Sequence, residues 1–270
     1  CADRVWIVLG FLFCSLGSAG GSLRLAEDNI DEIVKQMSLR EKAMLLVGCE
    51  SLVSKDSLTV YVPGAAGYTK SFPQYGIPST VMADGPVGVR IFPIKVDGKR
   101  HYCTCFPSST LLASTWDTQL VETQAGAMGE EAAVYDVDVI LTPGINIMRN
   151  PLCGRNFEYF SEDPVLSGLM GAAMVNGVQS RGIGTSLKHF VANNQQVNKL
   201  NNDSRIPVKA LREIYLKGFE ICLQHSNPWT VMSSYNKIGG ILTQSNAELL
   251  RTVLREEWGY DGLVVSDWYG

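Results

Sequence analysis

The chain has 270 residues, of which 46% are hydrophobic and 19% are charged. This is an ordinary globular composition, and the length is enough for one large α/β domain with a full core. The formal net charge of -4 argues against a nucleic acid or an anionic membrane surface as partner. The 3 histidines and 7 cysteines show no zinc-site or redox spacing, so we expect neither a metal nor another cofactor.

The first 20 residues are predicted to be a secretory signal peptide. Arg4 precedes an apolar run over residues 5–13, and small residues follow up to Ala19. The run is too short for a membrane span, which needs roughly 20 apolar residues. We therefore expect a secreted or periplasmic protein, with a cytoplasmic enzyme behind an unrelated leader as the alternative. Residues 21–270 are predicted to form one domain, because no linker rich in proline or serine interrupts them.

Strand-like and helix-like segments alternate after this leader. In chain order we predict a helix opened by the capping box at 38–41, a strand at 77–82, a helix at 117–135, a strand at 138–141, a helix at 163–180, a strand at 184–187, a helix at 207–223, a strand at 230–234, a helix opened by a second capping box at 245–248, and a strand at 263–266. This alternation indicates an α/β fold with a parallel sheet.

Polar side chains follow many of the strands rather than one switch point. That pattern favours a TIM-type (β/α)8 barrel over a doubly wound sheet, because catalytic groups of such barrels lie at the carboxyl ends of several strands. The number of predicted strands places the end of the chain near the penultimate strand of the barrel. The sequence therefore predicts a truncated barrel domain.

The polar residues at the strand ends are the candidate site. They are Asp84, Arg155, Lys188, His189, Tyr235, Asp267 and Trp268. As a set they suit a neutral ligand rich in hydroxyl groups, since carboxylates accept hydrogen bonds from hydroxyls and cations donate them. Asp267 is the candidate nucleophile, kept ionised by the cations and a phenol. Each residue alone is weak evidence, and Glu158, Glu162 and Asp163 equally fit the solvated start of a helix.

Five segments resemble motifs of glycoside hydrolase family 3, most closely its β-glucosidase branch. They are ADGPVGVR at 83–90, NPLCGRNFEYFSEDP at 150–164, KHF at 188–190, MSSYN at 232–236 and VSDW at 265–268. The resemblance covers about residues 30–270. It implies a retaining exo-glycosidase that hydrolyses terminal β-D-glucosyl residues of oligosaccharides or glycosides, with such a glycoside as its partner.

The resemblance also implies a role for each candidate residue. Asp267 matches the nucleophile of the family. The sugar-binding positions match Asp84, Arg155, Lys188 and His189. Tyr235 matches the residue that supports the nucleophile, and Trp268 lines the pocket.

Two departures from the family pattern stand out. Asn193–Gln196 and Lys199 occupy positions where the family often has NNQE followed by arginine, so both charges of a possible ion pair change together. The acid/base carboxylate of the family usually lies on a following domain, and this sequence stops before it. We therefore expect the chain by itself to be nearly inactive.

Other readings of the same motifs remain open. A β-xylosidase or α-arabinofuranosidase of the same family would use the same residues, and a non-catalytic sugar-binding barrel is the alternative from another class. The β-N-acetylglucosaminidase branch is disfavoured. Its Asp-Ser-His motif corresponds here to Asp203-Ser204-Arg205, and arginine cannot act as a general acid near neutral pH.

Overall fold

The structure is a computed structural model, and it describes residues 24–50, 62–96 and 99–268. The predicted signal peptide lies outside the described residues. The chain divides into two compact units, a smaller one of residues 1–52 with 67–80 and a larger one of residues 53–66 with 81–270. In the part of the chain that is described, no helix has the length and apolar character needed to cross a membrane.

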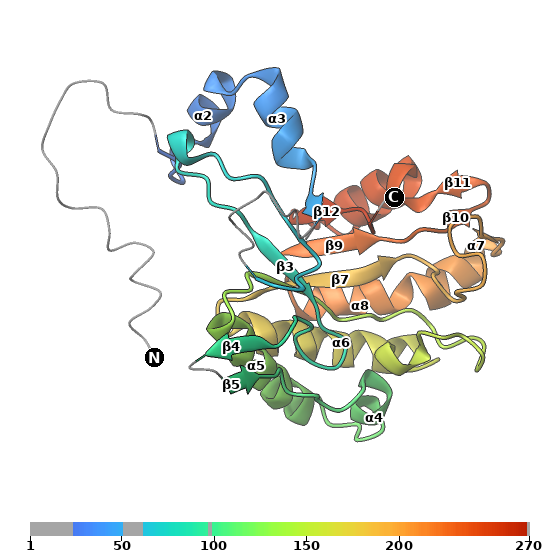
Figure 1. Cartoon of the computed structure of the whole chain (residues 1–270). Helices are drawn as coiled ribbons and strands as arrows, with labels where there is room; N and C mark the ends of the chain where they lie inside the picture. Colours follow the sequence, from blue (N-terminus) through green and yellow to red (C-terminus); the bar gives the residue numbers. More distant parts are fainter. Residues whose placement is uncertain (1–23, 51–61, 97–98, 269–270) are drawn as a thin grey trace, which may run out of the picture. The chain divides into compact units, whose positions relative to one another are not determined.

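The smaller unit holds two short helices and a strand pair (Figure 1). Its elements are α2 (Ile30–Gln36), α3 (Leu39–Leu46), β1 (Cys49–Glu50), the antiparallel β2 (Gly67–Tyr68) and a 3-10 turn at Pro73–Tyr75. The predicted capping box is confirmed: the Ser38 hydroxyl accepts from the Glu41 amide at 3.2 Å, and the Glu41 carboxylate accepts from the Ser38 amide at 2.8 Å. Ile33, Met37 and Phe72 form the core of this unit.

The larger unit is built on a curled half-barrel sheet of parallel strands. In spatial order the strands are β3 (Val81–Asp84), β6 (Val139–Leu141), β7 (Gly184–Phe190), β9 (Thr230–Ser233) and β12 (Leu263–Val265). Each strand pairs in parallel with the next one in this spatial order. The predicted α/β class and parallel sheet are confirmed, whereas the strand predicted at 77–82 begins only at Val81.

Helices cover one face of this sheet, where α5, α6 and α8 lie side by side (Figure 1). The helices are α4 (Ser109–Ala113), α5 (Thr118–Val134), α6 (Pro164–Gln179), α7 (Val208–Ala210), a π-helix at Leu211–Tyr215, α8 (Lys217–His225) and a π-helix at Glu248–Glu257. The backbones of α5 and α6 approach closely, because a Cβ atom at Gly177 would lie 2.3 Å from the carbonyl oxygen of Glu122.

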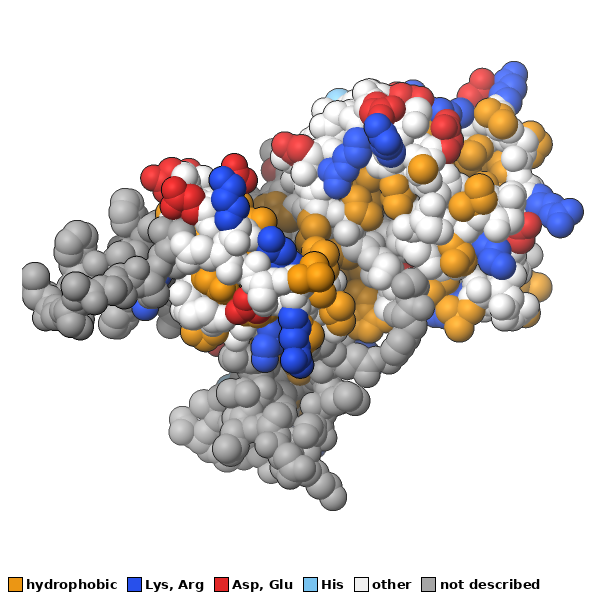
Figure 2. Space-filling model, turned by 90° about the horizontal axis from the view of Figure 1, so that it is seen from above, with side chains coloured by type: hydrophobic (Ala, Val, Ile, Leu, Met, Phe, Trp, Pro, Cys, Tyr) orange, Lys and Arg blue, Asp and Glu red, His pale blue; other side chains and the backbone are white. Residues whose placement is uncertain are grey.

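Short strands and 3-10 turns lie in the loops of the larger unit. They are β4 (Ile94–Val96), β5 (Lys99–His101), a 3-10 turn at Asn156–Glu158, β8 (Asp203–Ser204), β10 (Lys237–Ile238), β11 (Ile241–Leu242) and a 3-10 turn at Thr243–Ser245. On the face shown in Figure 2, Lys and Arg side chains are interspersed with Asp and Glu.

The central strand β7 carries two site residues inside the strand rather than after it, which corrects the sequence prediction. Every residue of β7 is buried, including Lys188 and His189. The register with β9 shifts at this point: Lys188 faces Met232 and Phe190 faces Ser233, so His189 is an extra residue. A bulge of this kind re-aims side chains that would otherwise alternate between the two faces.

The second predicted capping box names the wrong residue, because Asn246 and not Ser245 caps the helix. The Ser245 hydroxyl donates to the carbonyl of Leu242 at 3.3 Å, while the Asn246 side chain accepts from the Leu249 amide at 3.2 Å. We expect Asn246→Ala to lower the free energy of unfolding by about 1 kcal/mol, because an unpaired helix-terminal N–H results. Ser245→Ala is the matched control and should change it by less than about 0.5 kcal/mol. Urea denaturation measures both, and equal losses would contradict this assignment.

Candidate active site

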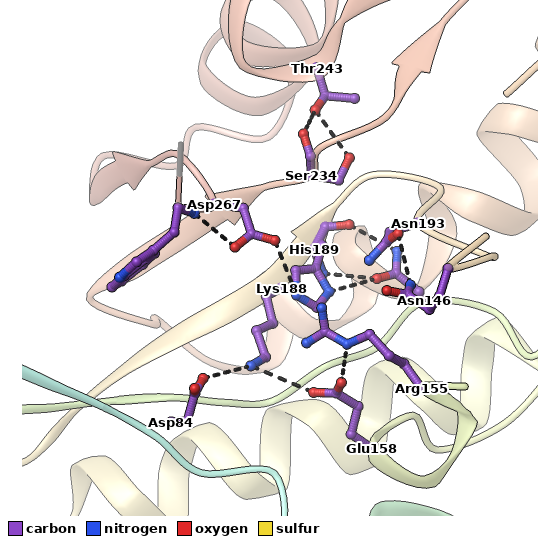
Figure 3. Close-up of polar contacts among 12 residues, drawn as sticks. Asp84, Asn146, Arg155, Glu158, Lys188, His189, Asn193, Ser234, Thr243 and Asp267 are labelled. Carbon is purple, nitrogen blue, oxygen red and sulfur yellow. Dashed lines mark hydrogen bonds and ion pairs between the residues drawn. The ribbon is translucent and has the colours of Figure 1, made fainter. Parts of the chain in front are cut away.

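The candidate residues converge at the carboxyl ends of the parallel strands (Figure 3). Asp84 is the last residue of β3, and Lys188 and His189 lie in the last half of β7. The loop after β6 supplies Arg155, and Asp267 follows the end of β12. All strands of a curled parallel sheet point the same way, so side chains at their carboxyl ends come together at one end of the sheet.

A chain of buried charges forms one side of the site. Glu158 is 3% exposed, and one carboxylate oxygen accepts from Nε of Arg155. Its other oxygen, Oε2, lies 3.6 Å from Nζ of Lys188, which is 3.8 Å from Oδ1 of Asp84. Burial opposes ionisation of Glu158, but Lys188 and Arg155 outweigh it and hold the pKa of this carboxyl below its usual value.

This arrangement changes the interpretation of the acidic residues in the motif at 150–164. The solvated helix start is wrong for Glu158, which is buried between two cations. It is right for Asp163, whose carboxylate accepts from the amides of Val165 and Leu166 at the first turn of α6. Glu162 is exposed, and no ion pair involves it among the described residues.

His189 is held by two residues that sequence reasoning missed. Its Nδ1 lies 3.3 Å from the Tyr159 hydroxyl and 3.3 Å from Oδ1 of Asn146. Asn146 also accepts from the backbone amide of His189 and donates to its carbonyl, both at 2.9 Å. Burial, together with Arg155 and Lys188, lowers the pKa of His189 well below its usual value. The imidazole is therefore neutral near pH 7, and its Nε2 faces Oδ2 of Asp267 at 3.8 Å without forming an ion pair.

Asp267 has one oxygen held and one oxygen free of hydrogen bonds. Oδ1 accepts from the backbone amide of Trp268 at 2.9 Å, and the Tyr235 hydroxyl also bonds the carboxylate. Oδ2 is buried and has no hydrogen-bond partner among the described residues. Burial raises the pKa of Asp267, although the Trp268 amide, Tyr235 and Arg155 act in the opposite direction.

The two aromatic residues of the set are anchored close to Asp267. The indole Nε1 of Trp268 donates to the carbonyl of Ala66 at 2.8 Å. Burial raises the pKa of Tyr235, and the charge of Asp267 acts in the same direction, so the phenol stays protonated as a donor. Lys199 lies over the Tyr235 ring with its Nζ 4.5 Å from the centroid. The departure from the family pattern at Lys199 therefore still supplies a cation beside the site.

The structure thus places all seven candidate residues in one region of the larger unit. Among the described residues no group of three or more His, Cys, Asp or Glu side chains is arranged to hold a metal ion. A buried carboxylate with a free oxygen, set beside neutral and cationic donors, can attack an electrophilic carbon of a neutral, polar molecule. Fold and site together define an α/β protein with a candidate active site at the carboxyl ends of its parallel strands.

Comparison with known proteins identifies the family. Residues 74–270 match the glycosyl hydrolase family 3 N terminal domain, and the chain belongs to this family. It is 44% identical over 244 residues to thermostable beta-glucosidase B of Acetivibrio thermocellus. The aligned region covers 89% of this chain and 30% of that protein. It is 45% identical over 240 residues to an exo-alpha-(1->6)-L-arabinopyranosidase of Bifidobacterium longum, covering 87% of this chain and 30% of that one.

Solved structures agree with this assignment. Beta-glucosidase 3B from Thermotoga neapolitana, in complex with glucose, is 52% identical with a TM-score of 0.85 over 90% of this chain and 34% of that chain. The beta-glucosidase from Kluyveromyces marxianus, in complex with glucose, is 36% identical with a TM-score of 0.78 over 88% of this chain and 27% of that chain. The chain therefore spans about a third of the length of these relatives, and the resemblance stated from the five motifs is confirmed.

Proposed function

We propose that the protein is a retaining exo-glycosidase that releases terminal β-D-glucosyl residues from oligosaccharides or glycosides. The observation that carries this proposal is the Asp267 carboxylate, with Oδ1 held by the Trp268 amide and the buried Oδ2 without a hydrogen-bond partner among the described residues. In the first step Oδ2 attacks the anomeric carbon and the aglycone oxygen leaves with the bonding electron pair. Water then attacks the same carbon and releases the sugar with its original configuration.

The neighbouring residues support binding of the terminal sugar. Asp84 is 38% exposed, and its nearest cations, Arg90 at 3.4 Å and Lys188 at 3.8 Å, leave lone pairs for sugar hydroxyls. Arg155 and Lys188 donate hydrogen bonds, and charge-assisted bonds of this kind are the stronger ones. His189 adds a neutral polar contact, and the Trp268 indole offers an apolar face to the pyranose ring.

The proposed proton donor lies on a part of the protein other than these residues. Glu158 is held ionised by two cations, and His189 is neutral and buried, so neither suits the role of general acid. The resemblance to family 3 assigns the acid/base carboxylate to a following domain. We also propose that the described half-barrel is one wall of a (β/α)8 barrel, and that residues 1–20 direct secretion.

A pentoside-hydrolysing enzyme is the second candidate. The exo-alpha-(1->6)-L-arabinopyranosidase of Bifidobacterium longum matches this chain as well as the beta-glucosidases do. The two activities differ in the sugar held by the same site rather than in the nucleophile. The beta-glucosidases that match in both sequence and structure favour the glucoside.

The proposed function is tested on the full-length protein with aryl β-D-glucosides, β-D-xylosides and α-L-arabinosides. We expect the glucoside to be cleaved fastest, with the β anomer of glucose appearing first in the NMR spectrum of the products. Initial formation of the α anomer would exclude retention. Glucose binding without any hydrolysis would favour the non-catalytic sugar-binding barrel.

Replacing Asp84 tests the sugar-binding role directly. We expect Asp84→Ala to lower kcat/KM, and the fall should correspond to a loss of about 3–5 kcal/mol of transition-state stabilisation. The reason is that two charge-assisted hydrogen bonds to sugar hydroxyls are lost. Asp261→Ala, which removes an exposed carboxylate elsewhere in the larger unit, is the control and should leave kcat/KM within about twofold. Near-normal kinetics for the Asp84 variant would show that Asp84 has only a structural role.

A further inference from the structure

The side chain of Asn146 gives His189 the hydrogen bonds that a neighbouring strand gives elsewhere along β7. The loop after β6 still runs beside β7 at this point, because the Ile145 amide donates to the Lys188 carbonyl at 2.8 Å. His189 is the extra residue of the bulge, and the register with β9 gives it no partner. The Asn146 carboxamide pairs with its backbone instead: Oδ1 accepts from the His189 N–H and Nδ2 donates to the His189 carbonyl, each at 2.9 Å. The backbone polar groups of the bulge are thereby satisfied.

These two backbone contacts fix which way round the Asn146 carboxamide lies. A backbone N–H can only donate and a carbonyl oxygen can only accept, so the atom that faces the His189 N–H is the carboxamide oxygen. The same Oδ1 lies 3.3 Å from Nδ1 of the His189 imidazole. A carboxamide oxygen has no hydrogen to donate, so this contact is a hydrogen bond only if Nδ1 carries the hydrogen. A neutral imidazole has one N–H, which leaves the lone pair on Nε2.

The contacts of Tyr159 agree with this tautomer. Its hydroxyl lies 3.3 Å from Nδ1 of His189, donates to the Asn193 carbonyl at 3.3 Å and accepts from the Asn193 side-chain amide at 3.3 Å. The single hydroxyl hydrogen is used on that carbonyl, so the hydroxyl can accept from Nδ1 but cannot also donate to it. With the lone pair on Nδ1, two buried acceptors, Nδ1 and Oδ1 of Asn146, would face each other at a cost in free energy.

The lone pair of Nε2 points into the candidate active site, on the side of Asp267 (Figure 3). Nε2 lies 3.8 Å from Oδ2 of Asp267, and Oδ2 has no hydrogen-bond partner among the described residues. Neither atom can donate to the other while the imidazole has this tautomer and the carboxylate is ionised. A hydroxyl group of the ligand can supply the hydrogen that Nε2 lacks.

We propose that Asn146 is a positioning residue that holds His189 in the tautomer with the hydrogen on Nδ1, so that Nε2 accepts a hydrogen bond from one hydroxyl of the terminal sugar. The inference rests on the proposed function for the identity of the ligand, whereas the tautomer is a property of the protein alone. It gives the contacts a direction: Arg155 and Lys188 donate to the sugar, and His189 accepts from it. The site therefore requires a hydroxyl hydrogen at one position of the sugar.

The first test observes the tautomer directly in the full-length protein. Solid-state NMR of the ¹⁵N-histidine-labelled protein distinguishes a ring nitrogen that carries a hydrogen from one that has a lone pair. The signals of His189 are assigned as those missing from the spectrum of His189→Ala. We expect the hydrogen on Nδ1 and the lone pair on Nε2 in the wild-type protein. We expect a population with the hydrogen on Nε2 to appear in Asn146→Ala.

The second test measures kcat/KM for 4-nitrophenyl β-D-glucoside and for its analogues with fluorine in place of the hydroxyl at carbon 3, 4 or 6. Fluorine is close to a hydroxyl in size but cannot donate a hydrogen bond. The hydroxyl that contacts Nε2 is the one whose advantage over fluorine is lost in His189→Ala. In the wild-type protein we expect fluorine at that position to lower kcat/KM by roughly 10- to 100-fold. In Asn146→Ala this ratio should shrink by about tenfold there and change by less than about twofold at the other positions.

A matched control lies in the same buried network. Asn193→Ala makes the same substitution at a residue that is 1% exposed, against 2% for Asn146, but the Asn193 side chain contacts Tyr159 and not His189. We expect this variant to keep the wild-type preference for the hydroxyl at every position. Dividing each kcat/KM by the wild-type value for the same substrate cancels the inductive effect of fluorine, and thermal unfolding shows whether each variant is folded.

Three results would overturn the inference. A hydrogen on Nε2 of His189 in the wild-type protein would contradict the tautomer, and this measurement needs no variant to fold. An equal fall in kcat/KM of Asn146→Ala for all four substrates would mean that Asn146 is only structural. An unchanged preference for the hydroxyl in that variant would separate Asn146 from sugar recognition. If the wild-type protein cleaves no glucoside, the proposed function fails and the sugar contact of Nε2 fails with it, while the NMR spectrum still decides the tautomer.

Discussion

Replacing Asp267 by alanine is expected to lower kcat for glucoside hydrolysis by roughly 10⁴-fold or more. The substitution removes the oxygen that forms the covalent bond. Glu158 also has a buried oxygen without a hydrogen-bond partner, but two cations, Arg155 and Lys188, flank it. Steady-state kinetics on the full-length protein measure the loss. In the wild-type protein, a 2-fluoro-glucoside should label the peptide that contains Asp267. A label on Asp84 or Glu162 would contradict the assignment.

Replacing Asp267 by asparagine should not destabilise the protein at neutral pH. Burial raises the pKa of Asp267 in the folded state, so its ionised form opposes folding. A raised carboxyl pKa contributes stability at low pH, and that contribution is lost as the pH rises through the folded-state pKa. Asp267→Asn should therefore be at least as stable as the wild-type protein at pH 7. A large loss of stability in urea denaturation would mean that the residue is mainly structural.

Replacing Glu158 by glutamine is expected to damage both stability and activity. Glutamine keeps the shape of the side chain but removes the buried counter-charge of Arg155 and leaves Lys188 with Asp84 alone, whose Oδ1 lies 3.8 Å from Nζ of Lys188. Removing one partner of a buried ion pair costs about 3–5 kcal/mol in the free energy of unfolding. We also expect kcat/KM to fall by roughly 10²-fold, because the two cations that are proposed to donate to the sugar lose their fixed positions. Urea denaturation and steady-state kinetics measure the two effects.

The pH dependence of stability separates this role from simple packing. The pKa of Glu158 is lowered in the folded state, so its contribution to stability is full above the pKa of the unfolded chain, about 4.3. That contribution is lost as the pH falls through the lower folded-state pKa, and Glu158→Gln should lack this part of the acid dependence.

Glu162→Gln is the matched control, since Glu162 lies in the same motif and is exposed. It should change the free energy of unfolding by less than about 0.5 kcal/mol. If the two variants behaved alike, the charge chain of Glu158 would not be supporting the site.

The family, the α/β class and the seven candidate residues could be named from the sequence alone. Five motifs in the family's order were enough to recognise the family, because a motif is recognised from its residues without knowledge of the fold. The helix starts at Asp117 and Asp163 were also predictable, since their carboxylates accept from backbone amides only two or three residues further along. Signals of this kind depend on neighbours in the chain and need no tertiary structure.

The contacts that hold these residues in place are visible only in the tertiary structure. Asn146 and His189 are 43 residues apart in the chain, and no local pattern indicates their three contacts. Glu158 looked like part of a solvated helix start, but the approach of Lys188 from β7 makes it a buried counter-ion. Burial and long-range pairing depend on which strands become neighbours and on the bulge at His189 that turns the side chains of β7 toward the site.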